Sequence, residues 1–187
     1  IYHEIEPAYL LGDFSLQPVD SGFVVSSSRP LKLGRRDGHV TSPDGTMWLS
    51  AGIGHDKTGA GKDDGDPFVI FDLGKPVDLG AIKIWNYNEV NLTARGVKRV
   101  QITGSATGKP DAFKIPIGTF VLDQAKSGST GPSSNPYFPR TLRVRACGVR
   151  FVKFDILSNH HGVEFPTRDG SVDNAFVGLS EVQFLSK

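Results

Sequence analysis

Several features that would point to particular protein classes are scarce in this chain. Its 187 residues include one cysteine, Cys147, so neither an internal disulfide nor a cysteine zinc cluster can form, and we expect Cys147 to be a small buried residue. No apolar run approaches the ~18 residues of a membrane-spanning helix. The 21 Lys+Arg and 20 Asp+Glu give a formal charge of +1, and the basic residues are scattered. The sequence therefore predicts no membrane insertion and no nucleic-acid partner.

Glycine and proline, in contrast, are frequent. The 22 Gly and 12 Pro are spread along the chain and interrupt every period long enough for a helix of several turns. Alternation predicts strands with one buried face; Val100 and Ile102, for example, oppose Gln101. The predicted strands are Phe68–Leu73, Ala81–Tyr87, Gly96–Thr103, Gly118–Leu122, Leu142–Ala146, Phe151–Leu157 and Val177–Leu185, with weaker candidates at Phe23–Ser26 and around Trp48.

This pattern predicts an all-β fold, an antiparallel β-sandwich or jelly roll, with less than ~10% helix. We find no internal repeat and no shift in composition, so residues 1–187 are expected to form a single domain. Three long connections, 52–66, 124–140 and 158–174, are rich in Gly, Ser, Asp or His. Long loops on a rigid frame commonly carry function.

Residues suited to binding a polar ligand occur in or beside these loops. Trp85 and Tyr87 end a predicted strand beside amide groups; aromatic faces pack on the apolar face of a sugar ring, while amides, Arg and His hydrogen-bond its hydroxyls. The alternative stays open that these aromatic residues only cover the sheet. The candidate ligand-binding residues are His55, Asn88, Arg95, His160 and Asn174.

Catalytic signatures are not found. Residues 52–57 lack the third glycine of a dinucleotide-binding fingerprint, and Gly104–Gly108 is not a nucleophile elbow. The adjacent His160 and His161 point to opposite sides of an extended chain, so they are poorly placed to ligate one ion together. The sequence predicts a protein that is not an enzyme.

The two ends of the predicted sandwich carry oxygen ligands. Asp37 and Thr46 lie near the front of the chain, and Glu181 lies on the last predicted strand. Carboxylate and hydroxyl oxygens suit a hard cation such as calcium. An all-β unit that brings these residues together can clamp one cation between its ends.

The chain resembles the discoidin, or coagulation factor type C, superfamily, which includes galactose-binding-like carbohydrate-binding modules. The resemblance covers Leu33 to Phe184 and rests, in order, on Asp37-Gly38, Thr46-Met47-Trp48-Leu49-Ser50, Phe68-Val69-Ile70-Phe71-Asp72-Leu73-Gly74, Arg150-Phe151-Val152-Lys153-Phe154 and Gly178-Leu179-Ser180-Glu181-Val182. It implies a structural Ca2+ near the chain ends. The implied ligands are Gly34, Asp37, His39, Thr46 and Glu181.

Three functions are compatible with this resemblance. The first is a non-catalytic carbohydrate-binding module that targets a covalently attached glycan-active domain to a polysaccharide or oligosaccharide, which raises the local concentration of that domain. The second is a protein-interaction module, because Trp85-Asn86-Tyr87-Asn88 and Arg95-Gly96-Val97-Lys98 also look like a branch found in a katanin-interacting protein. The third is a jelly-roll polysaccharide lyase. We expect a secreted or cell-surface location within a longer bacterial protein, since the chain begins with Ile1.

Overall fold

The computed structural model describes residues 14–15, 26–27, 47–50, 52–53, 64–89, 91–126, 139–167 and 174–187. Strands dominate these residues, and the two helical elements are single 3-10 turns, η1 (Thr93–Arg95) and η2 (Pro110–Ala112). The all-β prediction is confirmed. The strands are β1 (Phe14–Ser15), β2 (Ser26–Ser27), β3 (Trp48–Leu49), β4 (Phe68–Asn86), β5 (Val97–Ser105), β6 (Ile115–Val121), β7 (Arg140–Asn159) and β8 (Gly178–Ser186).

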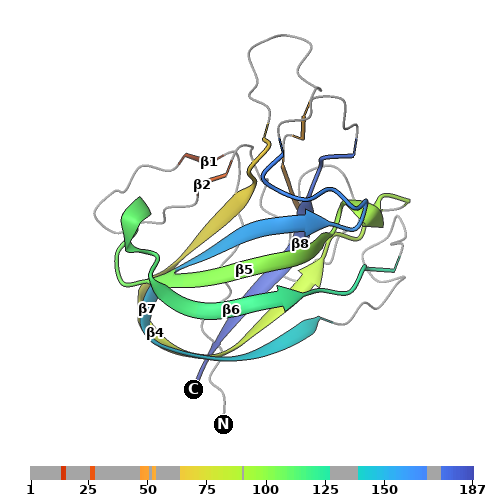
Figure 1. Cartoon of the computed structure of the whole chain (residues 1–187). Helices are drawn as coiled ribbons and strands as arrows, with labels where there is room; N and C mark the ends of the chain where they lie inside the picture. The colour runs from red at the N-terminus through yellow and green to blue at the C-terminus, as the bar shows by residue number, and fades with distance from the viewer. Residues whose placement is uncertain are drawn as a thin grey trace.

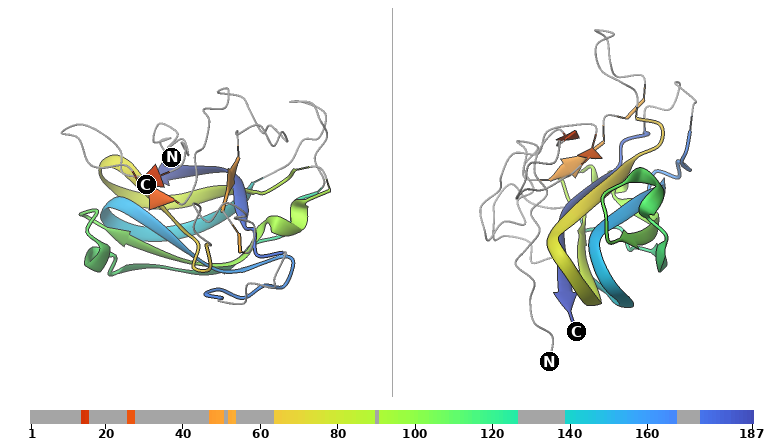
Figure 2. Two further views of the ribbon diagram at one scale, coloured as in Figure 1. Left: turned by 90° about the horizontal axis from the view of Figure 1, so that it is seen from above. Right: turned by 90° about the vertical axis from the view of Figure 1, so that its left-hand side faces the viewer.

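Two long bent strands, β4 and β7, connect the two layers of the sandwich. Residues 68–72 of β4 pair with 151–155 of β7, whereas 79–84 pair with 140–146. One layer contains β3, β8, late β4 and early β7, and the other contains early β4, late β7, β5 and β6. Every neighbouring pair is antiparallel. The views along the layers show both long strands curling from one layer into the other (Figures 1 and 2).

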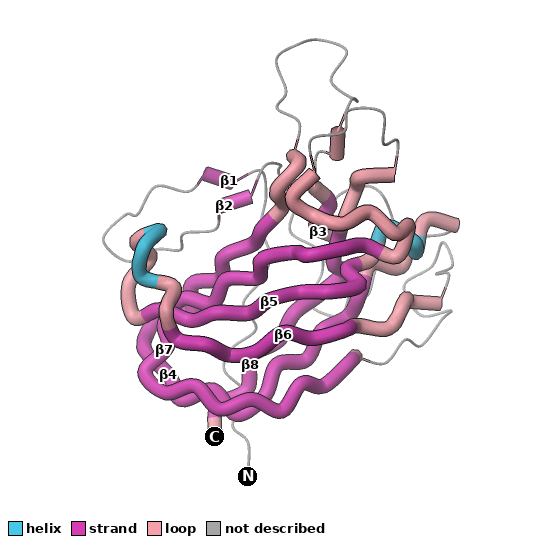
Figure 3. The backbone as a smooth tube through the Cα atoms, in the orientation of Figure 1, coloured by secondary structure: helices cyan, strands magenta, loops and turns pink. Residues whose placement is uncertain are grey.

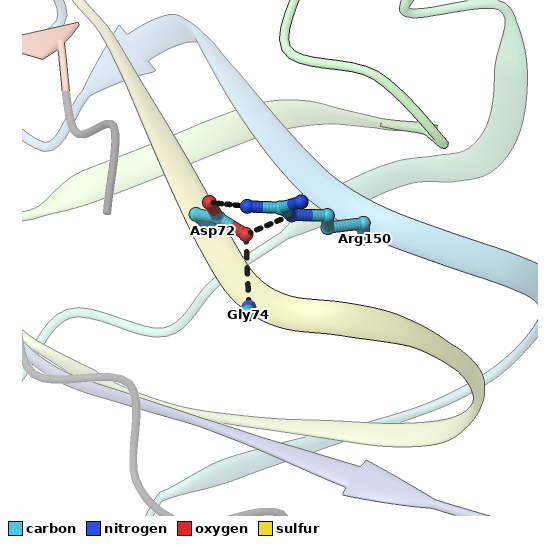
Figure 4. A network of polar contacts seen from close by, with 3 residues as sticks. All are labelled: Asp72, Gly74 and Arg150. Atoms are coloured by element: carbon cyan, nitrogen blue, oxygen red, sulfur yellow. Dashed lines mark hydrogen bonds and ion pairs between the residues drawn. The ribbon is translucent and has the colours of Figure 1, made fainter. Parts of the chain in front are cut away.

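The bend is fixed by a buried carboxylate. Asp72 accepts two 2.8 Å hydrogen bonds from Arg150, one from Nε and one from Nη2, and a third 2.8 Å bond from the Gly74 backbone N–H (Figure 4). Gly74 and Gly148 have φ of 75° and 65°, a backbone region that favours glycine because it has no Cβ. The two glycines turn β4 and β7 together, and the ion pair joins the strands beside the turn.

The core lies between the layers. Phe71 and Phe154 come from one layer and Phe184 from the other, with edge-to-face ring contacts at 5.1 Å between the Phe71 centroid and each partner. Val100 and Ile102 are completely buried, whereas Gln101 between them is exposed, which confirms the alternation predicted for β5. Burial also alternates along β7, where Leu142, Val144 and Ala146 and then Val152, Phe154 and Ile156 face the space between the layers.

Some boundaries differ from the predicted ones. The segments predicted as Phe68–Leu73 and Ala81–Tyr87 are joined in the single strand β4, which ends at Asn86, and Leu142–Ala146 and Phe151–Leu157 are parts of β7. Register shifts between Asp72 and Ala81 let pairing continue through the bend, so a turn signal does not end the strand. Trp48 lies in β3 as predicted, and only Ser26 of the segment Phe23–Ser26 is described, in β2.

The expectation that Cys147 is buried is wrong. Cys147 is exposed, because it follows the buried Ala146 on the outward side of β7, directly before the Gly148 turn. Among the described residues, no helix has the length and apolar character needed to span a membrane.

Candidate functional site

Several chain segments meet at the end of the sandwich where β4 and β7 finish and β8 begins (Figure 1). They are the connection after β4, which contains η1, the segment after β6, and the segments described between β7 and β8. Backbone bonds join them: His160 N–H donates to Gly96 O at 3.1 Å, and Leu122 N–H donates to Lys98 O at 2.8 Å. This group of segments is called the loop end below.

A buried asparagine, Asn86, organises one half of the loop end. It is 2% exposed, and its Nδ2 donates to Val97 O at 2.7 Å and to Asp123 O at 2.9 Å. Its Oδ1 accepts from Tyr87 N–H at 2.9 Å and from Val97 N–H at 2.8 Å. A Cβ at position 96 would lie 2.7 Å from this oxygen, so Gly96 is required for the close approach. One amide thus fixes three segments.

Asn159 has the corresponding role in the other half. It is completely buried, and its Nδ2 donates to Asn174 O at 2.7 Å and to Phe176 O at 2.9 Å. Its Oδ1 accepts from Val163 N–H at 3.0 Å. The end of β7 therefore holds the segment that leads into β8, and Phe176 is brought toward η1.

Arg95, the last residue of η1, is held from two sides at this end. Its Nη1 lies 3.9 Å from Glu89 Oε2, and its guanidinium carbon lies 4.7 Å from the centroid of the Phe176 ring. Glu89 Oε2 also accepts a hydrogen bond from the hydroxyl of Tyr87, which is 2% exposed. The Arg95 side chain keeps 24% of its surface exposed, so part of this pre-positioned cation is accessible to solvent.

The environment keeps Tyr87 protonated. Burial is the largest cause that raises the pKa of the Tyr87 hydroxyl well above its usual value, and the hydrogen bond and negative charge of Glu89 raise it further. Arg95 acts in the opposite direction with a smaller effect. Tyr87 therefore serves as a hydrogen-bond donor that orients Glu89.

The two adjacent histidines have different surroundings. His161 is exposed, and its pKa is lowered by partial burial first and then by the charge of Arg95. His160 is half-buried, and burial is the largest cause that lowers its pKa; Lys98 also lowers it, whereas Leu122 and Asp123 raise it. His160 Nε2 has no hydrogen-bond partner within the part of the chain that the structure describes. His161 is thus the histidine beside Arg95 that solvent reaches.

The structure places the predicted ligand-binding residues in different environments. Arg95, His160 and Asn174 lie at the loop end, and Asn174 is exposed. Asn88 is 1% exposed, and its Oδ1 accepts a 2.8 Å hydrogen bond from Ser180 Oγ, so it joins the end of β4 to β8. Trp85 and Tyr87 are both buried, at 7% and 2% exposed, which favours sheet cover over an open aromatic platform. His55 lies outside the described residues.

Comparison with solved structures places this architecture among known folds. A CBM32 module from Clostridium perfringens, solved in complex with GalNAc-β-1,3-galactose, superimposes with a TM-score of 0.50 and 13% identity over 87% of this chain and 93% of that chain. The chain has a discoidin-like β-sandwich fold. No protein-family model and no curated protein matches the sequence.

Two further structures with the discoidin-like fold are similar to the chain. An F5/8 type C domain from Bacteroides fragilis has a TM-score of 0.48 and 13% identity, covering 90% of this chain and 95% of that chain. A CBM32 module from a family 31 glycoside hydrolase of Clostridium perfringens has a TM-score of 0.45 and 16% identity, covering 75% of each chain.

The candidate ligand-binding residues predicted from the sequence did not include Phe176 or His161, which both lie at the loop end. Phe176 joins Arg95 only because Asn159 holds the backbone before β8, and no local pattern reports a contact between positions so far apart. Alternation along an extended chain places adjacent side chains on opposite sides, so it could have indicated that only one of His160 and His161 is exposed.

The predicted calcium ligands fall mainly outside the described residues, namely Gly34, Asp37, His39 and Thr46. Glu181 is described: it lies on β8, half-buried, and its Oε1 accepts a 2.8 Å hydrogen bond from Gln183 Nε2. Met47, which follows Thr46 in the sequence, contacts Ser180, which precedes Glu181: Ser180 Oγ lies 3.2 Å from Met47 Sδ. This contact fits the predicted calcium site, which stays a prediction.

Proposed function

We propose that the chain is a non-catalytic carbohydrate-binding module that binds a saccharide at its loop end. The observation that supports this proposal most is the fixed position of Arg95, between Glu89 and Phe176 and beside the exposed His161. The discoidin-like fold, shared with a module solved with GalNAc-β-1,3-galactose, is the second support.

The chemistry of the loop end suits a sugar without charge. The partly exposed guanidinium of Arg95 can donate to ring hydroxyls, and the exposed His161 and Asn174 can donate or accept. Glu89 offsets the charge of Arg95, so a neutral polyol meets polar groups without an uncompensated charge. Because side chains at exposed loop ends lose hydration only in part on binding, we expect dissociation constants of ~10 μM to 1 mM.

A binding role fits these residues better than a lyase role. A lyase of the type considered above needs a Tyr that gives up its proton, whereas burial and Glu89 raise the pKa of the Tyr87 hydroxyl. Glu89 is itself engaged by Tyr87 and Arg95. These groups are arranged to orient one another, which is typical of a fixed binding surface.

The described residues do not form a large apolar surface on which a protein partner could dock. Among them, Val121 is the only large hydrophobic residue classed as exposed, with 64% of its surface accessible. Protein interfaces of the apolar type need a contiguous patch. We therefore place the carbohydrate-binding function ahead of the protein-interaction function.

The proposal includes a structural calcium and a larger protein. Glu181 would supply a carboxylate, together with Asp37, Thr46 and backbone oxygens at Gly34 and His39, and the ion would hold the two ends of the domain together. We further propose that the module is part of a longer secreted bacterial protein whose attached catalytic domain it targets to a glycan.

Titration calorimetry against plant, algal and bacterial polysaccharides tests the proposal. Arg95→Met keeps a long side chain over Phe176 but removes the N–H donors. We expect at least a tenfold loss of affinity, since a hydrogen bond to a charged group contributes about 1.5–3 kcal/mol and about 1.4 kcal/mol is tenfold. The matched control is Arg99→Met, because Arg99 is also partly exposed and paired, with Glu164 at 3.0 Å. Equal saccharide affinity of both variants and the unaltered chain would argue against a binding site at the loop end. The absence of binding to every polysaccharide tested would argue against the carbohydrate-binding function.

A further inference from the structure

One edge of the sandwich carries a row of unbalanced positive charge. Early β7 forms the outer strand of its layer in the described part of the chain, and it lies at the margin of the sheet (Figure 3). Arg143 and Arg145 are both exposed, and the residues between and beside them, Leu142, Val144 and Ala146, are buried. Residues two apart point to the same side of a strand, so the two guanidinium groups project together, with their Cα atoms about 6.5 Å apart along the strand.

Cross-strand neighbours supply no acid to this row. Arg143 pairs with Ala81 of β4, and Lys83 of β4 pairs with Thr141 of β7. Across β4, Lys83 also pairs with Gln183 of β8. No hydrogen bond or ion pair within the described residues involves the side chain of Lys83, Arg143 or Arg145, so these three charges are not neutralised there.

The row continues past Arg145 to the bend of β7 at Gly148. Cys147 is exposed on the same side, and Lys187 Nζ lies 3.9 Å from its sulfur. The four cationic residues are named the basic edge: Lys83, Arg143, Arg145 and Lys187. Two acids border it: Asp78 accepts a 2.9 Å hydrogen bond from Gly148 N–H, and Glu181 accepts one from Gln183. Both donors are neutral, so four cations stand beside two carboxylates and a net positive charge is left.

We propose that the basic edge binds a linear anionic polysaccharide, one that carries sulfate or carboxylate groups along its length. The cations of the basic edge come from β4, β7 and the residue after β8, and the two arginines lie two positions apart on β7. Such a row suits a polymer with charges at intervals, and exposed guanidinium groups bind such oxyanions in a bidentate manner. The site is separate from the loop end, where Glu89 compensates Arg95. The inference does not depend on the sugar site proposed there.

Nucleic acid and membranes fit the basic edge less well. A sequence-independent nucleic-acid or lipid surface needs a broad basic field, whereas the chain has a formal charge of +1. The alternative role of these arginines is to prevent strand pairing between molecules, as charged residues on edge strands do. If that were their only role, the chain would have no affinity for a polyanion. The experiment below separates these outcomes.

The test compares binding of heparin, a sulfated polysaccharide with carboxylates, by the unaltered chain and by Arg143→Gln/Arg145→Gln at several salt concentrations. We expect the variant to bind about tenfold more weakly at low salt, with a salt slope reduced by about 2, one for each lost cation. The matched control is Lys109→Gln/Lys114→Gln, which removes the same charge from two exposed residues that flank η2. Its affinity should change less than twofold. Arg143→Lys/Arg145→Lys keeps the charge but not the planar fork, and should bind with intermediate affinity.

Several results would overturn the proposal. The first is the absence of heparin binding by the unaltered chain at 50 mM salt. The second is an equal loss of heparin affinity in the Lys109→Gln/Lys114→Gln control. The third is binding of a 20-base-pair DNA or of phosphatidylserine vesicles that is as tight as heparin binding and depends on the same arginines. Self-association of Arg143→Gln/Arg145→Gln without any change in heparin affinity would assign the arginines to edge protection alone. If the glutamine variant does not fold, the lysine variant decides: its salt slope should stay the same because it keeps both charges, and an unchanged affinity would overturn binding through the guanidinium groups.

Discussion

Removing the Asn86 side chain should weaken the fold and the loop end together. Asn86→Ala deletes four hydrogen bonds, to Val97 O, Asp123 O, Tyr87 N–H and Val97 N–H, all between 2.7 and 2.9 Å. Each such bond contributes about 0.5–1.5 kcal/mol net, so the four together contribute about 2–6 kcal/mol to the free energy of unfolding. We expect the upper part of this range because Asn86 is only 2% exposed. Its backbone partners would be left buried, without water to replace the lost hydrogen bonds.

Urea unfolding followed by tryptophan fluorescence measures this change. Both tryptophans of the chain, Trp48 and Trp85, are buried, so their emission reports on loss of the fold. The matched control is Asn174→Ala: its side chain is exposed, and the bond to Asn159 uses its backbone oxygen, so stability should change by less than about 0.5 kcal/mol.

Hydrogen exchange adds a local readout to the same comparison. The Val97 amide donates to Asn86 Oδ1, so it should exchange faster in Asn86→Ala and at the unaltered rate in Asn174→Ala. A stability loss below about 1 kcal/mol in Asn86→Ala, or one no larger than in the control, would refute the assignment of Asn86 as the organiser of the loop end.

Three further outcomes follow from the described contacts. The pKa of His160 and of His161 is lowered below the ordinary 6.5, so the unfolded chain takes up protons before the folded chain as the pH falls. The melting temperature should therefore fall between pH 7.5 and 5, and it should fall less steeply in His160→Gln. Equal slopes of the two proteins would contradict this expectation. Arg150→Met leaves the Asp72 carboxylate, whose side chain is 1% exposed, without its partner; we expect a loss of about 3 kcal/mol in urea unfolding, partly recovered by adding Asp72→Asn. If the proposed calcium is present, a chelator should lower the melting temperature and Glu181→Gln should have the same effect; an unchanged melting temperature in a metal-free sample counts against it.

The strand framework was predictable because alternation is a local signal. Val100 and Ile102 on β5 are buried as expected, and the apolar runs of β4 and β8 lie in the core. Turn signals were less informative. Gly74 and Gly148 bend β4 and β7 without ending them, since pairing between the two strands continues on both sides of the bend.

The candidate site was predictable only in part, because long-range contacts decide which polar side chains are exposed. Arg95 could be chosen from its residue type and its place beside a strand end. Asn88 could not be assigned in the same way: Ser180 of β8 binds and buries it, and no local pattern reports that contact. The basic edge could not be predicted from the sequence either, because Lys187 joins it only through a contact with Cys147 that is distant in sequence.

A glycan array probed in parallel with the unaltered chain and with Arg95→Met tests the central claim most directly. The account predicts that the unaltered chain binds at least one neutral saccharide on the array and that Arg95→Met loses this signal while it unfolds at the same temperature. Retention of every signal by Arg95→Met, or the absence of any saccharide signal for the unaltered chain, would contradict the proposal that the loop end is a carbohydrate-binding site.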